Sequence, residues 1–127
     1  MKETCLSILK NEGYLPTIDD DGDILVKVQG LAFYVMASDT DDMYLRVLLP
    51  SFWSLDSEQE FAKAHFVANK LNKEYKVGKI FLSKDNTYAS CELFINKDDV
   101  YLNKILLRLF QLLFSMRKDF ADEMNGK

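Results

Sequence analysis

The stretch that decides the fold is residues 20–49, DDGDILVKVQGLAFYVMASDTDDMYLRVLL. Apolar residues alternate with other residues over 24–28, 31–38 and 43–49, as they do in strands with one face on a core. Asp-Gly, Gln-Gly and a run of aspartates separate these segments, and such residues favour tight turns. The stretch therefore predicts a meander of antiparallel strands.

Helical patterns flank this meander. Residues 4–13 show a short apolar stripe, and Pro50 is expected to end the last strand. Residues 57–60, Ser-Glu-Gln-Glu, form a capping box ahead of apolar residues spaced three and four apart. A hairpin follows over 80–95, and two aspartates open a final helix over 98–124. The order α-β-β-β(-β)-α-β-β-α predicts an α+β fold in which an antiparallel sheet packs with helices.

The composition is that of a globular protein. With 48% hydrophobic and 28% charged residues, the 127 residues are expected to form a single domain, 1–127. The net charge is −4 and the basic residues are scattered, which argues against a nucleic-acid partner. The two cysteines, Cys5 and Cys91, fit neither a disulfide framework nor a metal motif.

No membrane or secretory segment is expected. The N-terminus lacks the continuous apolar run of a signal peptide. The most apolar window, 100–116, is interrupted by Lys104 and Arg108, so it does not suit a membrane-spanning helix. The protein is therefore expected to be soluble and cytoplasmic.

The final helix is apolar over more than half of its girth. A first stripe of leucines, Ile105, Met116 and Phe120 would dock it on a sheet. A second stripe lies about 100° further round the axis; it consists of Leu107, Phe110 and Phe114. Two explanations are open. The second stripe is covered within the monomer by the N-terminal helix or a strand edge, or it is an interface, either a homodimer seam or a groove for a partner.

The outward faces of the predicted strands are also rich in apolar residues. Aromatic, Met and Arg residues are enriched at the cores of protein interfaces. Here the outward positions, beside Lys27 and Arg46, are Leu25, Tyr34, Met36, Tyr44 and Leu48. This face is a second candidate surface for a partner or a dimer, unless a helix of the same chain covers it.

Two acidic turns are expected to lie at the same end of the meander. Residues 19–23 and 39–42 together hold seven carboxylates, which suit a divalent cation, a basic segment or simply solvated turns. A calcium loop of the EF-hand type would require a glutamate where Val28 stands, so that motif fails.

The sequence contains no catalytic motif. His65 is the only histidine, and Cys91 lies on an apolar strand face, where a thiol is inert. There is no glycine-rich phosphate loop and no nucleophile elbow. No catalytic residue, metal or cofactor is therefore predicted.

The runs Asp20–Val26 and Gly30–Val35, with the hairpin and the final helix, resemble the YbjN-like family over nearly the whole chain. Its bacterial members are described as regulators of sensory transduction, and their fold resembles that of type III secretion chaperones. Those chaperones are small, acidic α/β homodimers that bind an extended segment of a client protein. The resemblance implies a protein-binding role and brings no catalytic residues.

Together these features predict a non-enzymatic protein-binding module, chaperone-like or a regulatory adaptor, that acts as a homodimer on a protein client. The alternative is a regulatory domain that binds a small ligand in a cleft between sheet and helix.

Overall fold

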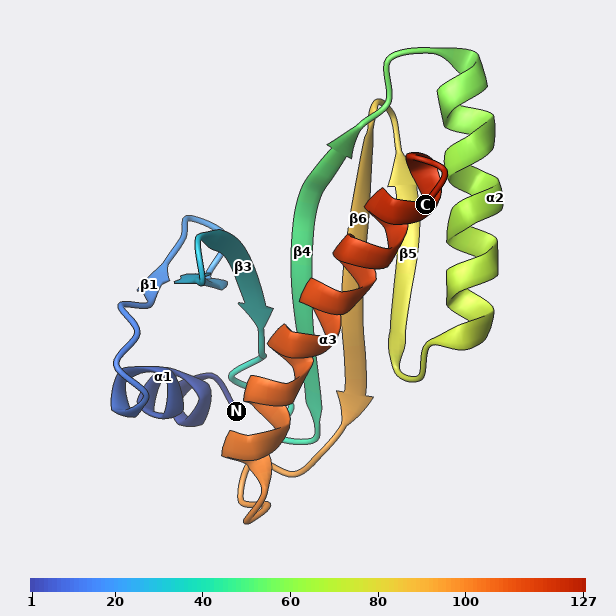
Figure 1. The fold of residues 1–127 in the computed structure, drawn as a ribbon. Helices are drawn as coiled ribbons and strands as arrows, with labels where there is room; N and C mark the ends of the chain where they lie inside the picture. Colours follow the sequence, from blue (N-terminus) through green and yellow to red (C-terminus); the bar gives the residue numbers. More distant parts are fainter.

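A computed structural model describes residues 1–127 and contains three helices and six strands (Figure 1). In chain order these are α1 (Lys2–Asn11), β1 (Thr17–Ile18), β2 (Ile24–Val28), β3 (Leu31–Met36), β4 (Tyr44–Ser54), α2 (Glu58–Glu74), β5 (Gly78–Ser83), β6 (Asn86–Phe94) and α3 (Leu102–Met124). The strands form one antiparallel sheet in the order β1-β2-β3-β4-β6-β5. The predicted α+β fold and its element order are confirmed.

The helices and the sheet enclose a single core. Figure 1 shows α3 crossing the sheet and α2 running alongside β5. Side chains of all three helices join the inward positions of β2 to β6 in one cluster of 29 buried residues. Alternation along each strand thus sends every second side chain into this core and the others to the opposite face. No helix has the length and apolarity that a membrane crossing requires.

The prediction that the strand ends at Pro50 is wrong. The strand continues to Ser54, and its pairing with β6 shifts register between Leu49 and Trp53. Proline lacks an N–H to donate to a neighbouring strand, so a bulge, where pairing is interrupted, accommodates it. Beyond the bulge, Phe52 and Trp53 pack edge-on against Phe120 of α3.

The helix ends also differ from the sequence pattern. α3 begins at Leu102, after turns in which Asp99 accepts a hydrogen bond from the Tyr101 N–H. At the start of α2, Ser57 Oγ accepts the Glu60 N–H as expected, at 3.1 Å. The Glu60 carboxylate, however, accepts the indole N–H of Trp53 at 2.9 Å. The capping box is therefore half formed, and Glu60 ties α2 to the end of β4.

A close approach between β5 and α3 depends on Gly78. A Cβ at this position would lie 2.5 Å from the sulfur of Met116, which is fully buried. Because real Cβ atoms do not approach a neighbour so closely, any larger residue here would force the buried Met116 side chain to move.

We expect Gly78→Ala to destabilise the fold by about 1–3 kcal/mol, because an added methyl group overpacks the core. Urea unfolding followed by circular dichroism measures this loss. The double variant Gly78→Ala/Met116→Ala should lose less than the sum of its single variants, since the second change makes room for the first. Additive losses would contradict the steric explanation.

Candidate functional site

The face of the sheet opposite the core has no helix over it. Leu25, Tyr34, Leu48 and Ser90 lie in one row across β2, β3, β4 and β6. The five apolar residues that the sequence assigned to this face are half-buried, and none belongs to the core or packs against it. We call this surface the outer face.

Three further aromatic residues extend the outer face across the hairpin of β5 and β6. Phe81 and Tyr88 stack with their ring centroids 5.3 Å apart. Phe94 tilts against Tyr44 at 6.1 Å and is 82% exposed. Sequence reasoning missed these residues because it followed only the inward positions, such as Ile80 and Cys91. The alternation that located the inward residues also determines the outward ones.

Polar groups interrupt the apolar surface near its centre. The Glu92 carboxylate accepts hydrogen bonds from the Tyr44 hydroxyl and, at 3.0 Å, from Lys79 Nζ. These two bonds hold the pKa of Glu92 below its usual value, while burial and the bond to Glu92 raise the pKa of Tyr44 to about 12. Arg46 Nε and Ser90 Oγ are buried without a hydrogen-bond partner. The centre of the outer face thus combines the hydrogen-bonded Glu92 with two polar atoms that lie beneath neighbouring side chains.

The second stripe of α3 is largely covered within the monomer, which is one of the two alternatives that the sequence left open. Phe110 is 1% exposed, and its ring meets that of Phe33 on β3 edge-on at 5.0 Å. Phe114 meets the same ring at 5.4 Å, and both Leu107 and Phe114 are half-buried against the core. The candidate interface role of Phe110 therefore needs correction, because the Phe33 side chain of β3 packs against it within the monomer.

The two edges of the sheet differ in their access to a further strand. At β5, Ile80 N–H donates to Asn72 Oδ1 at 2.7 Å, and Asn72 Nδ2 donates to the Ile80 carbonyl at 3.1 Å. The side chain of Asn72 thus occupies the middle of this edge as a neighbouring strand would. At the other edge, β1 pairs only with Ile24 and Leu25, so the rest of β2 has no strand neighbour on that side.

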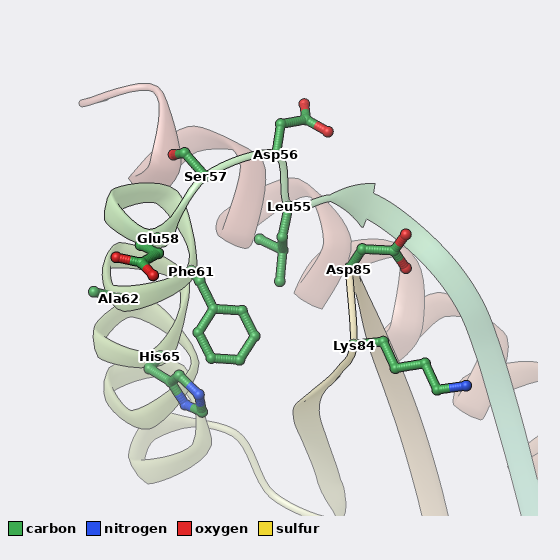
Figure 2. Close-up of a pocket in the computed structure, with 9 residues that line it drawn as sticks. All are labelled: Leu55, Asp56, Ser57, Glu58, Phe61, Ala62, His65, Lys84 and Asp85. Carbon is green, nitrogen blue, oxygen red and sulfur yellow. The ribbon is translucent and has the colours of Figure 1, made fainter.

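The largest pocket lies between the start of α2 and the turn joining β5 to β6, with a volume of about 680 Å³. Figure 2 shows Phe61 and His65 side by side on α2, with ring centroids 4.7 Å apart. The charged groups of Lys84 and Asp85 point away from these rings. No pair of polar groups converges on a point in this pocket, so its geometry does not indicate a reaction.

Neither cysteine is accessible. Cys5 and Cys91 are fully buried, and burial raises their pKa values to about 11 and about 12. His65, by contrast, is exposed on α2. No group of three or more His, Cys, Asp or Glu side chains is arranged to hold a metal ion.

We expect Phe110→Ala to cost about 3–5 kcal/mol of stability, because it opens a cavity in the core. Phe94→Ala removes an equally large but exposed ring and should change stability by no more than about 0.5 kcal/mol. Urea unfolding of the two variants tests the assignment. Equal effects would mean that Phe110 lies on the surface in solution.

Comparison with known proteins gives a consistent result. Residues 3–127 match a family described as T3SS (YopN, CesT) and YbjN peptide-binding chaperone 1, or TY-Chap1. No curated protein matches the sequence at a significant level.

Three solved structures have a similar fold. The type III secretion chaperone SycH of Yersinia pestis, in complex with a stable fragment of YscM2, is 12% identical with a TM-score of 0.63, over 94% of this chain and 98% of that chain. YbjN from E. coli is 8% identical with a TM-score of 0.56, over 98% and 88%. An uncharacterised protein from Methanothermobacter thermautotrophicus is 16% identical with a TM-score of 0.50, over 94% and 98%.

At identities this low, the structural likeness shows the fold alone, and it confirms the expected likeness to type III secretion chaperones and YbjN. The family match covers nearly the whole sequence. The chain therefore belongs to the TY-Chap1 family of peptide-binding chaperones.

Proposed function

We propose that residues 1–127 act as one non-enzymatic domain that binds an extended segment of a client protein on the outer face. The observation that carries this proposal is the aromatic and aliphatic surface centred on Tyr34, Met36 and Leu48, which no part of the chain covers. Exposed apolar patches of this kind are typical of sites for protein partners. Membership of a peptide-binding family and the likeness to SycH bound to a YscM2 fragment support it.

The outer face suits an extended segment in both shape and chemistry. Tyr44 and Phe94 offer rings on which apolar side chains can pack. Lys79 and Glu92, whose side chains are partly exposed, add polar groups to the same face. The unpaired part of β2 borders it and presents free backbone groups, which extended peptides often use. We place the protein in the cytoplasm, where its client would be captured before folding or export.

We expect Met36→Lys/Leu48→Lys to weaken client binding at least about tenfold, the equivalent of about 1.4 kcal/mol. An array of short peptides tiled over unrelated proteins selects binders, and fluorescence anisotropy measures their dissociation constants. Gln111→Lys/Ser115→Lys adds the same charge to exposed positions of α3 and should leave binding unchanged. If both double variants bind as the parent protein does, the outer face is not the client site.

We further propose that the protein is a homodimer, with the exposed side of α2 as its interface. Phe66 projects from this side and is 73% exposed, away from the outer face.

Light scattering coupled to size exclusion should give a mass near twice 14.7 kDa. Phe66→Glu should shift it toward the monomer, because a buried unpaired carboxylate is costly. A mass of one chain across a hundredfold concentration range would contradict the proposed homodimer and would not affect the proposed client site.

One observation favours a small-ligand role as a second candidate. A groove of about 480 Å³ lies between α3 and the connection from α2 to β5, lined by Val77, Leu93, Ile105 and Leu112 beside Arg108. A ligand at about 100 times its dissociation constant would stabilise the fold by about 2.7 kcal/mol. A thermal-shift screen detects such a gain, and it should persist in Met36→Lys/Leu48→Lys if the ligand uses this groove.

A further inference from the structure

The outer face runs without a break into an acidic end of the sheet. A pocket of about 450 Å³ lies where the turn after β1 meets the turn between β3 and β4. Its walls include Met36 and Tyr44 of the outer face together with Asp21, Asp23 and Asp39. The two acidic turns are thus neighbours, as the meander predicts. We call the carboxylates of Asp19–Asp23 and Asp39–Asp42 the acidic rim.

Only two of the seven carboxylates in the acidic rim have a cationic partner. Lys2 lies 3.5 Å from Asp39, and Asp42 pairs with the Met1 amine at 3.1 Å and more loosely with Lys97. The carboxylates of Asp20, Asp21 and Asp23 form neither an ion pair nor a hydrogen bond. The acidic rim therefore keeps an excess of negative charge beside the outer face.

Repulsion within the acidic rim is visible at Asp23. Burial, and then the neighbouring charges of Asp19 and Asp21, raise the pKa of the Asp23 carboxyl, although Lys2, which also lines the pocket, acts to lower it. A positive group brought into the pocket would relieve this repulsion. The opposite end of the sheet has a much smaller excess, because Lys27 and Lys84 lie there with Asp56, Glu58 and Asp85. The charge around the outer face is thus distributed unequally between its two ends.

We propose that the client segment is apolar where it lies on the outer face and carries Lys or Arg residues at the end that meets the acidic rim. Complementary charge at one end fixes the direction in which a segment binds and excludes segments with acidic flanks. This inference rests on the proposed client site and adds the chemistry of the client.

Three synthetic peptides with one identical extended core of alternating Leu, Phe and Ser test it. One carries three lysines at an end of the core, one three glutamates and one three serines. We expect the lysine peptide to bind at least about tenfold more tightly than the glutamate peptide near 50 mM salt, and this ratio to shrink near 300 mM salt, where exposed charges are screened.

Asp21→Asn/Asp23→Asn should reduce that ratio about fivefold, since exposed ion pairs contribute modestly. Circular dichroism verifies its fold, and Asp19 is left intact because it accepts the backbone N–H groups of Asp21 and Asp23. The control Asp56→Asn/Asp85→Asn removes two charges from the other end of the sheet and should leave the ratio unchanged.

The outcomes separate the two proposals. Equal binding of all three peptides, or an unchanged ratio in Asp21→Asn/Asp23→Asn, overturns the acidic-rim inference and leaves the client site standing. Failure of all three peptides to bind overturns the client site and the inference with it. A lysine preference lost equally in both double variants also overturns the inference, because net charge alone would then explain it.

Discussion

The packing of every helix on one face of the sheet is the constraint on which the rest of this structure depends. α3 is apolar over most of its girth, and it packs on β4, β5 and β6 while Phe33 of β3 contacts it from the side. Phe33 covers Phe110 from one side, and Phe52 covers Phe120 from the other. Gly78 lets the last part of the sheet close on Met116. Because the buried apolar side chains of all three helices lie on this face, no helix covers the other.

Contacts between α2 and α3 complete the core and close one sheet edge. The Tyr75 hydroxyl donates to Asp119, and Lys70 pairs with Glu123 at 2.6 Å. With α2 held in this place, Asn72 reaches the backbone of Ile80 and occupies the β5 edge. The other edge stays open along β2. The molecule thus has an uncovered face bordered by one accessible edge, which suits binding of an extended chain more than chemistry on a small substrate.

Much of the fold was predictable because local patterns agree with one another. Alternation over 24–28 and 31–36, with glycine at the turns, leaves few alternatives to a meander. The prediction that the strand ends at Pro50 was wrong because a proline interrupts a strand only where the neighbouring strand would accept a hydrogen bond from that residue's N–H. The bulge between Leu49 and Trp53 removes that need, and a bulge is a property of two paired strands.

The candidate surface was predictable only in part. Alternation shows that Tyr34, Met36 and Leu48 share a face, but the absence of a covering helix follows from the arrangement of all the elements. For Phe110 the difficulty is the reverse: the helical pattern places it outside the main stripe, but contacts with residues far along the chain, such as Phe33, bury it.

By itself, the sequence determined the order of the elements, the inward and outward positions of each strand and the acidic turns, because these follow from backbone periodicity and turn chemistry. The tertiary structure alone decided which face stays open, which edge Asn72 closes and that Met36 lies beside Asp23 in one pocket. These features depend on contacts between residues far apart in the chain, and no local pattern encodes such contacts.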